Sequence, residues 1–449
     1  MNEPNPSLKK WKTFLGYGTG DFALNLFWQG TGFYLFFFYA NVAGLPTTAI
    51  GAIFLIASVW DAISDPVMGY LAERTNSRWG PYRPYLLFGA IPLSLSFILL
   101  FTPVEIDEKI WKTAYYLSVL LLFRTCYTVV SIPYSALSAR VTRNSDARTK
   151  LAGIRMYFGF LGGISISFFA KTLQETFGDA EAFHYMGIGA AVAATAILCI
   201  CFKNTQESAN PINEISTQAS IIDSFRSIIA NKPFLLLIGG IMFVTVATTV
   251  IGQTLLFYFE SQLNERSTGN LAIIIMTAAP LISIPLWASL TLKVGKRNAW
   301  ILGSVIAIIG LIWLFFDTSK SPTFALIEIT MVTFGLSAYA LIFWSMLPDT
   351  LEYGEYHSSV HSESLLIGIA SSFQKISIGL SAFTLGFLLD AVGYNAGIAS
   401  SSATTQGIKS IFALIPAAAL VISSLLIFFY PITSKMHAQI VTALQKKIS

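Results

Sequence analysis

About twelve apolar runs, separated by short polar segments, occupy nearly the whole chain, and each reaches or exceeds the roughly 20 residues that a helix needs to cross a bilayer. The runs fall at about 14–40, 46–73, 84–103, 112–138, 151–171, 183–203, 233–258, 268–292, 298–316, 322–347, 365–390 and 407–431. Of the 449 residues, 54% are hydrophobic and only 12% are charged, which excludes an ordinary water-soluble globule. The sequence therefore predicts an all-α integral membrane protein that lies in a lipid bilayer.

The distribution of basic residues predicts the orientation. Most of the 28 Lys and Arg residues fall in the N-terminal segment and in every second loop. Because short cytoplasmic loops carry an excess of positive charge, we expect both termini in the cytoplasm. The polar start MNEPNPSLKK has no cleavable apolar core, so we expect the first run to remain as a membrane helix. The net charge of +4 then reflects topology, and no nucleic-acid partner is expected.

A polar segment separates the sixth run from the seventh and divides the chain into two sets of six. Six helices followed by six is a pattern typical of transporters. The loops GYLAERTNSRWGPYRP and SLTLKVGKRNAW, which follow the second and eighth runs, show a weak internal echo. We predict an N-terminal six-helix bundle at 1–203, a central cytoplasmic loop at 204–232, a C-terminal six-helix bundle at 233–431 and a cytoplasmic tail at 432–449.

Two carboxylates interrupt the second apolar run, in the stretch WDAISDPVMGY. Asp61 and Asp65 are four residues apart, so they share one face of a helix and can hold one cation between them. Ionised groups at membrane depth are costly and usually mark an ion or substrate path. Ser64 and Thr128 offer neutral oxygens for Na⁺, which takes several hard oxygen ligands much as Ca²⁺ does. We predict a cation site here for Na⁺ or H⁺.

A third carboxylate, Asp21, lies in the first run, and Asn25 and Trp28 follow it on the same helical stripe. Two basic residues, Arg124 and Arg155, also fall inside predicted membrane helices. They suit either contact with a ligand or the role of countercharge. In the alternative hypothesis, the aspartates of the second run pair with these arginines and only tie helices together.

Further motifs resemble one transporter family over essentially the whole chain and in family order. They are WDAISDPVMGYLAERTNSRWGPYRPYLLFGA, GDFALN, YTVVSIPYSALSARVT, GIRMYF, LEYGEYHSSVHSES and FQKISIGLSAF. This set is similar to the glycoside, pentoside and hexuronide cation symporters. The resemblance implies the major facilitator fold, with 12 transmembrane helices in two six-helix bundles. It also implies cation-coupled transport of a small-molecule sugar or glycoside by alternating access, in a monomer of the bacterial plasma membrane without an organic cofactor.

The resemblance also assigns roles to individual residues. Asp61 and Asp65 resemble the ligands of the coupling cation. Asp21 resembles an acid that accepts hydrogen bonds from sugar hydroxyls, and Arg155 resembles the arginine on the sugar side. Lys375 resembles a lysine of the eleventh helix that the family places close to the coupling site.

One departure concerns specificity. Melibiose-transporting members carry a second sugar-holding aspartate in the fourth helix, where this chain has Ser131, and an aromatic residue where it has Ser135. Arg124 lies seven residues before Ser131 and therefore on the same face. We expect a substrate other than a galactoside, and an added positive charge suits an anionic sugar. Trp28 and Trp344 are candidates for stacking on a pyranose ring.

Two groups of potential metal ligands are better explained without a metal. The three cysteines fall in apolar runs without metal or disulfide spacing. His357 and His361 are four apart and flanked by Glu355 and Glu363, a spacing that can bind a transition metal on a helix. Because they lie in a polar cytoplasmic loop, we expect a solvated cap or a gating contact instead.

Three other functions are alternatives to sugar symport. The string GTGDF at 18–22 matches intramembrane aspartyl proteases, but such an enzyme needs a second aspartate on a preceding helix, and none precedes the first run. We therefore expect no enzyme. A cation-coupled carrier of amphipathic, lipid-like solutes and an exporter of the same fold stay open.

Overall fold

The computed structural model describes residues 6–141, 145–205, 230–358, 363–396, 401–433, 436–437, 439–440 and 442–443. Its elements are helices: α1 (Pro6–Gly30), the π-helix η1 (Thr31–Leu35), α2 (Phe36–Asn41), α3 (Thr47–Arg74), α4 (Arg83–Leu100), α5 (Lys109–Val141), α6 (Ser145–Thr176), α7 (Asp179–Asn204), α9 (Lys232–Tyr258), the π-helix η2 (Phe259–Leu263), α10 (Arg266–Val294), α11 (Lys296–Phe316), α12 (Pro322–Ser358), α13 (Glu363–Ala391) and α14 (Ser402–Phe428). The all-α prediction is confirmed.

Eleven of the described helices are long and apolar enough to cross a membrane. A helix satisfies its backbone hydrogen bonds internally, which is why apolar runs in lipid take this form. The remaining long helix, α1, is more polar and continues through η1 and α2 as far as Asn41. Several helices extend beyond their predicted apolar runs; α6, for example, begins at Ser145 and α12 ends at Ser358. In both, the helical backbone continues past the apolar stretch into polar residues.

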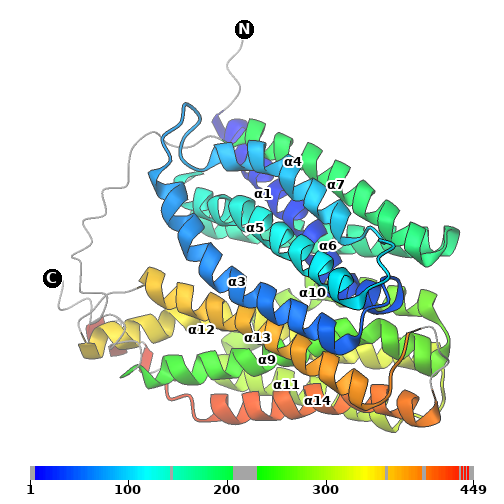
Figure 1. Ribbon diagram of the computed structural model, residues 1–449. Coiled ribbons are helices and arrows are strands. Elements are labelled where there is room, and N and C mark those ends of the chain that lie inside the picture. Colours follow the sequence, from blue (N-terminus) through cyan, green and yellow to red (C-terminus); the bar gives the residue numbers. More distant parts are fainter. Residues whose placement is uncertain are drawn as a thin grey trace.

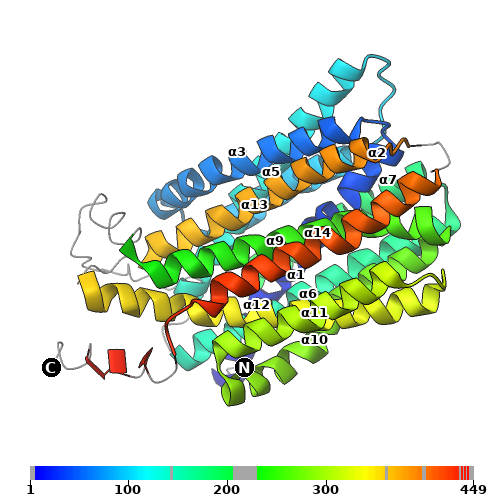
Figure 2. The same ribbon diagram turned by 90° about the horizontal axis from the view of Figure 1, so that it is seen from below.

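The helices before and after the central polar segment form two layers, which Figure 1 shows one above the other. We refer to residues 6–205 as the first half and to 230–433 as the second half. Across the boundary, α3 packs along α13 and α6 packs along α10. In Figure 2, α13 lies beside both α3 and α9. The proposed bundle boundaries stay a prediction, since residues 206–229 lie outside the described part.

Polar contacts join the two halves at the far end of the molecule, by which we mean the end where α3 begins and α13 ends. Tyr394 Oη donates to Asn41 Oδ1 at 2.5 Å. Asn270 Nδ2 donates to Gln174 Oε1, also at 2.5 Å. These bonds link α2 to the segment after α13 and α6 to α10, so the two halves are held together at that end.

Two glycines let α3 and α13 approach closely near the far end. A Cβ atom on Gly51 would lie 2.9 Å from the backbone oxygen of Ala382. A Cβ atom on Gly386 would meet the backbone oxygen of Thr47 and would lie 3.2 Å from the Cα atom of Gly51. Small residues permit such backbone contact between membrane helices. This glycine seam, Gly51 with Gly386, brings the two halves into direct backbone contact.

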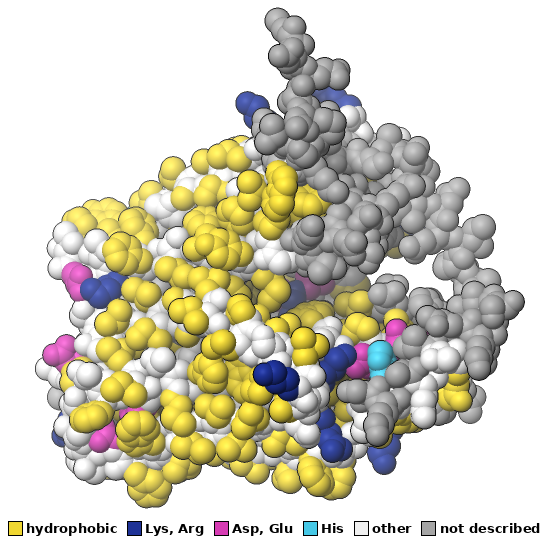
Figure 3. All heavy atoms as spheres, turned by 180° about the vertical axis from the view of Figure 1, so that it is seen from behind, with side chains coloured by type: hydrophobic (Ala, Val, Ile, Leu, Met, Phe, Trp, Pro, Cys, Tyr) yellow, Lys and Arg dark blue, Asp and Glu magenta, His cyan; other side chains and the backbone are white. Residues whose placement is uncertain are grey.

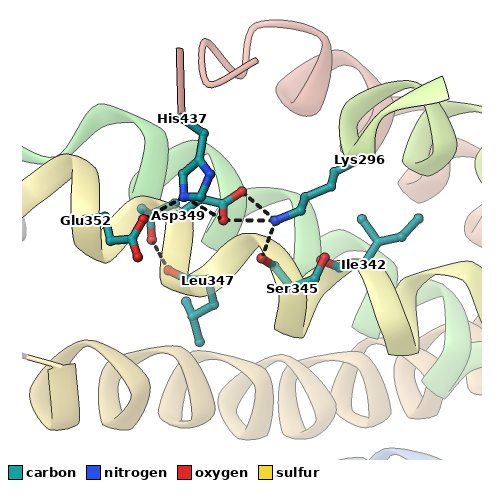
Figure 4. Close-up of polar contacts among 8 residues, drawn as sticks. Lys296, Ile342, Ser345, Leu347, Asp349, Glu352 and His437 are labelled. Atoms are coloured by element: carbon teal, nitrogen blue, oxygen red, sulfur yellow. Dashed lines mark hydrogen bonds and ion pairs between the residues drawn. The ribbon is translucent and has the colours of Figure 1, made fainter. Parts of the chain in front are cut away.

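A cluster of charged side chains occupies the opposite, near end of the second half (Figure 4). Lys296, the first residue of α11, donates to Asp349 Oδ2 at 2.7 Å and to the Ser345 backbone oxygen at 2.8 Å. From the C-terminal segment, His437 Nε2 lies 2.6 Å from Glu352 Oε2 and 3.4 Å from Asp349 Oδ1. These contacts fasten the segment after α14 to α12.

Hydrophobic side chains cover much of the described surface in Figure 3. Large apolar residues are exposed on many helices; Leu292, for example, is 89% exposed and Phe387 62%. An apolar exterior of this extent is stable in lipid and not in water. The protein is therefore an integral membrane protein.

Candidate functional site

Asp61 forms a buried ion pair with Arg124. Asp61 extends from α3 and Arg124 from α5, and Arg124 Nη1 lies 3.0 Å from Asp61 Oδ2. Only 3% of the Asp61 side chain and 5% of the Arg124 side chain are exposed. Removing one partner of such a pair leaves an uncompensated buried charge, which is strongly destabilising. The pairing expected under the alternative hypothesis is therefore present for Asp61.

Asp65 lies one turn further along α3 and contacts both halves of the protein. Thr128 on α5 donates its hydroxyl to Asp65 Oδ1 at 2.8 Å. Lys375 on α13 forms an ion pair with Asp65 Oδ2. This pair is less buried than the first, with 22% of Lys375 and 18% of Asp65 exposed. Asp65 thus connects α3 and α5 of the first half with α13 of the second.

The predicted oxygen ligands of the cation are close together on α3 and α5. Ser64 is adjacent to Asp65, and its Oγ is buried without a hydrogen-bond partner among the described residues. Two carboxylates and two hydroxyls thus supply hard oxygens of the kind that Na⁺ takes. In this structure the ammonium of Lys375 and the guanidinium of Arg124 supply the positive charge beside the carboxylates.

The third carboxylate, Asp21, meets a base from another helix as well. Arg155 Nη2 on α6 lies 3.1 Å from Asp21 Oδ1 on α1. Asn25 Nδ2 donates to the backbone oxygen of Asp21 at 2.9 Å. The Arg155 side chain is 30% exposed and that of Asp21 15%, so this pair is accessible to a solute. The guanidinium carbon of Arg155 also lies 5.2 Å from the ring centre of Tyr134.

Arg124 connects the two sets of residues. Its guanidinium carbon lies 5.1 Å from the ring centre of Trp28, close enough for a cation–π contact. The Trp28 ring in turn packs against Tyr127, with the ring centres 5.5 Å apart. Trp28 lies two turns beyond Asp21 on α1. A side chain that pairs with Asp61 therefore also contacts the stripe that carries Asp21.

A cavity of about 250 Å³ lies between the two halves beside Trp28 and Arg124. Its lining comes from α1, η1, α3 and α5 of the first half and from α9, α10 and α13 of the second: Trp28, Gln29, Thr31, Gly32, Phe33, Phe54, Arg124, Thr245, Thr248, Thr249, Gly252, Gln253, Met276 and Ile378. A concave space between two halves, with a few polar groups on apolar walls, is typical of a small-molecule site.

Two predicted substrate residues are not joined to this cluster by a described polar contact. Ser131 is partly buried on α5, one turn beyond Thr128. Trp344 on α12 is 51% exposed, and its ring packs against Phe343, the preceding residue. Neither side chain lines the cavity. Their roles stay predictions.

The side chains of His357, His361 and Glu363 lie outside the described part, so the metal alternative is not tested.

Sequence reasoning missed two features. Tyr17 and Tyr134 donate their hydroxyls to each other's backbone oxygens, at 3.0 and 2.8 Å, and their rings stack beneath Arg155. Every residue has a backbone oxygen, so a sequence does not show which one a tyrosine hydroxyl will contact. This pair of hydrogen bonds was therefore not predictable. The second feature is the polar face of α9 in the cavity. Its threonines recur at helical spacing within an apolar run, and that periodicity was visible in the sequence.

Comparison with known proteins finds a family model and relatives that are named as transport proteins. A family model described as MFS/sugar transport protein matches residues 16–434. The chain is 27% identical over 441 residues to the glucuronide carrier protein homolog of Escherichia coli, covering 97% of this chain and 96% of that protein. It is 30% identical over 438 residues to the uncharacterized symporter YnaJ of Bacillus subtilis, covering 96% and 94%.

Solved structures show the same architecture. A bacterial homolog of the human lysosomal transporter Spinster, in an inward-facing and unoccupied conformation, superposes with a TM-score of 0.70. The match covers 98% of this chain and 99% of that one at 15% sequence identity, so it supports the fold alone. The relatives are transporters, which sets aside the aspartyl protease alternative. With its family match over nearly the whole length, the chain belongs to the MFS/sugar transport protein family.

Proposed function

We propose that this protein is a cation-coupled symporter that carries a sugar or glycoside by alternating access. The family description and the relative named as a glucuronide carrier support a sugar substrate. The name symporter, given to a second relative, supports a coupling ion. The observation that carries the proposal is the ion pair between Asp65 and Lys375, because it joins a carboxylate of the proposed cation site in one half to a base of the other.

The coupling cation, Na⁺ or H⁺, binds at Asp61 and Asp65 with Ser64 and Thr128 as neighbours. To reach Asp65 it displaces Lys375, whose ammonium is the more exposed of the two bases at the site. The Oγ of Ser64, which has no hydrogen-bond partner in the described part of the chain, is then available as a ligand. Once Lys375 leaves Asp65, one link between α3 and α13 is lost. Cation binding thereby changes the free energy of association of the two halves.

The substrate binds beside Asp21, Asn25 and Arg155, where the carboxylate and the guanidinium offer charge-assisted hydrogen bonds to hydroxyls. Trp28 supplies a ring face for the sugar. Because Arg124 contacts both Asp61 and Trp28, a shift of Arg124 on cation binding alters the substrate surface. Coupling of this kind is reciprocal, so the substrate also tightens binding of the cation.

The expected orientation places the near end and both termini in the cytoplasm of a bacterial cell. The hydrogen bonds of Tyr394 with Asn41 and of Asn270 with Gln174 then lie on the outside. In this orientation the described conformation is closed toward the outside. Export by the same fold would use the same contacts between the halves in the opposite direction.

Purified protein in proteoliposomes tests the proposal. Radiolabelled glucuronides, pentosides and galactosides are offered with an imposed Na⁺ gradient, an imposed pH gradient or neither. We expect one class of sugar to accumulate with one gradient, and Asp65→Asn to abolish that accumulation. Glu328→Gln, which removes a different buried carboxyl group, is the control and should transport normally. Accumulation by Asp65→Asn, or binding of lysolipids in place of every sugar, would overturn the proposal.

A further inference from the structure

The cavity between the halves has a polar wall on α9. Thr245, Thr248, Thr249 and Gln253 follow one another at the spacing of one helix face and line the cavity together. Thr245 donates its hydroxyl proton to the Ile241 backbone oxygen at 2.8 Å. Thr248 does the same to backbone oxygens of its own helix. With their protons engaged, these hydroxyls present lone pairs to the cavity, so this part of the wall accepts hydrogen bonds.

Gln253 provides the strongest indication of a ligand. Its side chain is 3% exposed and its Oε1 is buried without a hydrogen-bond partner among the described residues. A buried acceptor left without a donor costs free energy that a folded protein rarely leaves uncompensated. Gln253 is one of the residues that line the cavity, so a turn of its buried amide group would bring this oxygen to a donor in that space. Hydroxyl groups of a solute are such donors.

The cavity is displaced from Asp21 and Arg155, the charged pair that holds the substrate in the proposed function. On α1, Gln29 lines the cavity and Asp21 pairs with Arg155. Eight residues of helix separate Gln29 from Asp21, a rise of roughly 12 Å. One pyranose ring spans less than this rise. Trp28 lies between them and borders the cavity, so a solute that fills both places passes along its ring.

We propose that the cavity is a second subsite, which binds a hydroxylated unit joined to the sugar at Asp21 and Arg155. Gln253 and the α9 threonines accept its hydroxyl protons, and Gln29 faces it from α1. The preferred substrate is then a two-unit glycoside whose second unit is itself a sugar, and neither a free monosaccharide nor a glycoside with an apolar second unit. This assignment rests on the proposed function, since it extends the same binding site.

Binding by purified wild-type protein is measured for matched pairs of sugars: cellobiose with glucose, melibiose with galactose, and glucuronosyl-xylose with glucuronic acid. We expect one disaccharide to bind at least tenfold more tightly than its monosaccharide, the size of one or two added hydrogen bonds. Gln253→Leu and, separately, Thr249→Val should remove most of that advantage and leave monosaccharide affinity unchanged. Thr330→Val, an exposed threonine on α12 whose hydroxyl donates to the Leu326 backbone oxygen, is the matched control.

The outcomes separate the two proposals. If no sugar of any pair binds to the wild-type protein, the proposed function fails. If monosaccharides bind as tightly as their disaccharides, the second subsite is wrong while the proposed function stands. The subsite is also wrong if the α9 variants weaken both members of a pair equally, or if they change nothing, as expected for a cavity that holds water alone. Should Gln253→Leu fail to fold, Thr249→Val gives the same comparison.

Discussion

In the first half of the chain, three carboxylates at membrane depth each meet a basic side chain from another helix. In the second half, Glu328 on α12 is fully buried, and both of its carboxyl oxygens lack a hydrogen-bond partner among the described residues. The nearby Lys409 donates instead to the Asp317 backbone oxygen at 2.5 Å. Of these acids, only Asp65 is paired with a base of the other half, Lys375. We therefore predict that the partners of a buried acid, and not its burial alone, distinguish a coupling residue from a structural one.

The largest effect is expected for Asp61→Asn. The substitution leaves Arg124 buried without its partner, a loss that costs about 3–5 kcal/mol. Cation-driven accumulation should disappear as well. The double variant Asp61→Asn with Arg124→Gln should recover much of the lost thermal stability but not the accumulation, measured in detergent and in proteoliposomes. If the single variant still concentrates substrate as wild type does, Asp61 is a structural partner and not a cation ligand.

Asp21→Ala should have a smaller effect on stability, because its partner Arg155 is 30% exposed and can be solvated. Substrate affinity should fall by about 1.5–3 kcal/mol, the range for hydrogen bonds to a charged group. Cation binding should persist, since Asp61 and Asp65 are untouched. Titration calorimetry with sugar and with cation separates the two effects. Loss of cation binding with sugar binding intact would reverse the roles assigned to these carboxylates.

Ser131→Asp tests whether α5 contributes to the sugar site. If Ser131 faces the ligand, the added carboxylate should improve binding of neutral galactosides by about 1–3 kcal/mol and weaken binding of the natural substrate. Arg124 is already held by Asp61 at 3.0 Å, which limits its ability to neutralise the new charge. Ser118→Asp, on the exposed side of the same helix, is the control. No gain for any galactoside would place Ser131 away from the ligand.

The smallest effect is expected for Glu328→Gln. No described helix partner depends on this carboxyl group, so transport and the choice of coupling ion should match wild type. The change in unfolding free energy should stay within about 1 kcal/mol, as for substitutions that break no specific interaction. Transport assays at several pH values provide the check. A lost or shifted pH dependence would show that an unpaired acid in the second half does take part in coupling.

The sequence predicted most of the fold because apolar length alone defines a membrane helix. The second run, 46–73, corresponds to α3 at Thr47–Arg74. Where the apolar run and the helix differ, as in α12, a polar final stretch through Ser358 keeps helical geometry that hydropathy does not register. The spacing of Asp61 and Asp65 placed both on one face, and the structure joins each of them to α5.

Side-chain partners were less predictable. Sequence could not decide whether Arg124 or Arg155 meets Asp61, since both lie at membrane depth and the choice depends on how α5 and α6 rotate against α3 and α1. The prediction that Lys375 lies close to the coupling site came from the family resemblance and not from the residues around it in the sequence. The roles of Ser131 and Trp344 remain predictions. Whether each side chain points toward the ligand depends on how its helix packs, and the periodicity of one sequence does not reveal that.

We expect the glycine seam to influence how the protein divides its time between conformations. Where Gly51 and Gly386 meet, closure at the far end depends on two bare backbones in contact. A methyl group there destabilises only the closed arrangement, so Gly386→Ala would shift the resting population toward molecules open at that end without altering any ligand-binding group. In the proposed transport cycle, the size of the residue at this one contact would therefore set which side of the membrane the empty protein prefers to face.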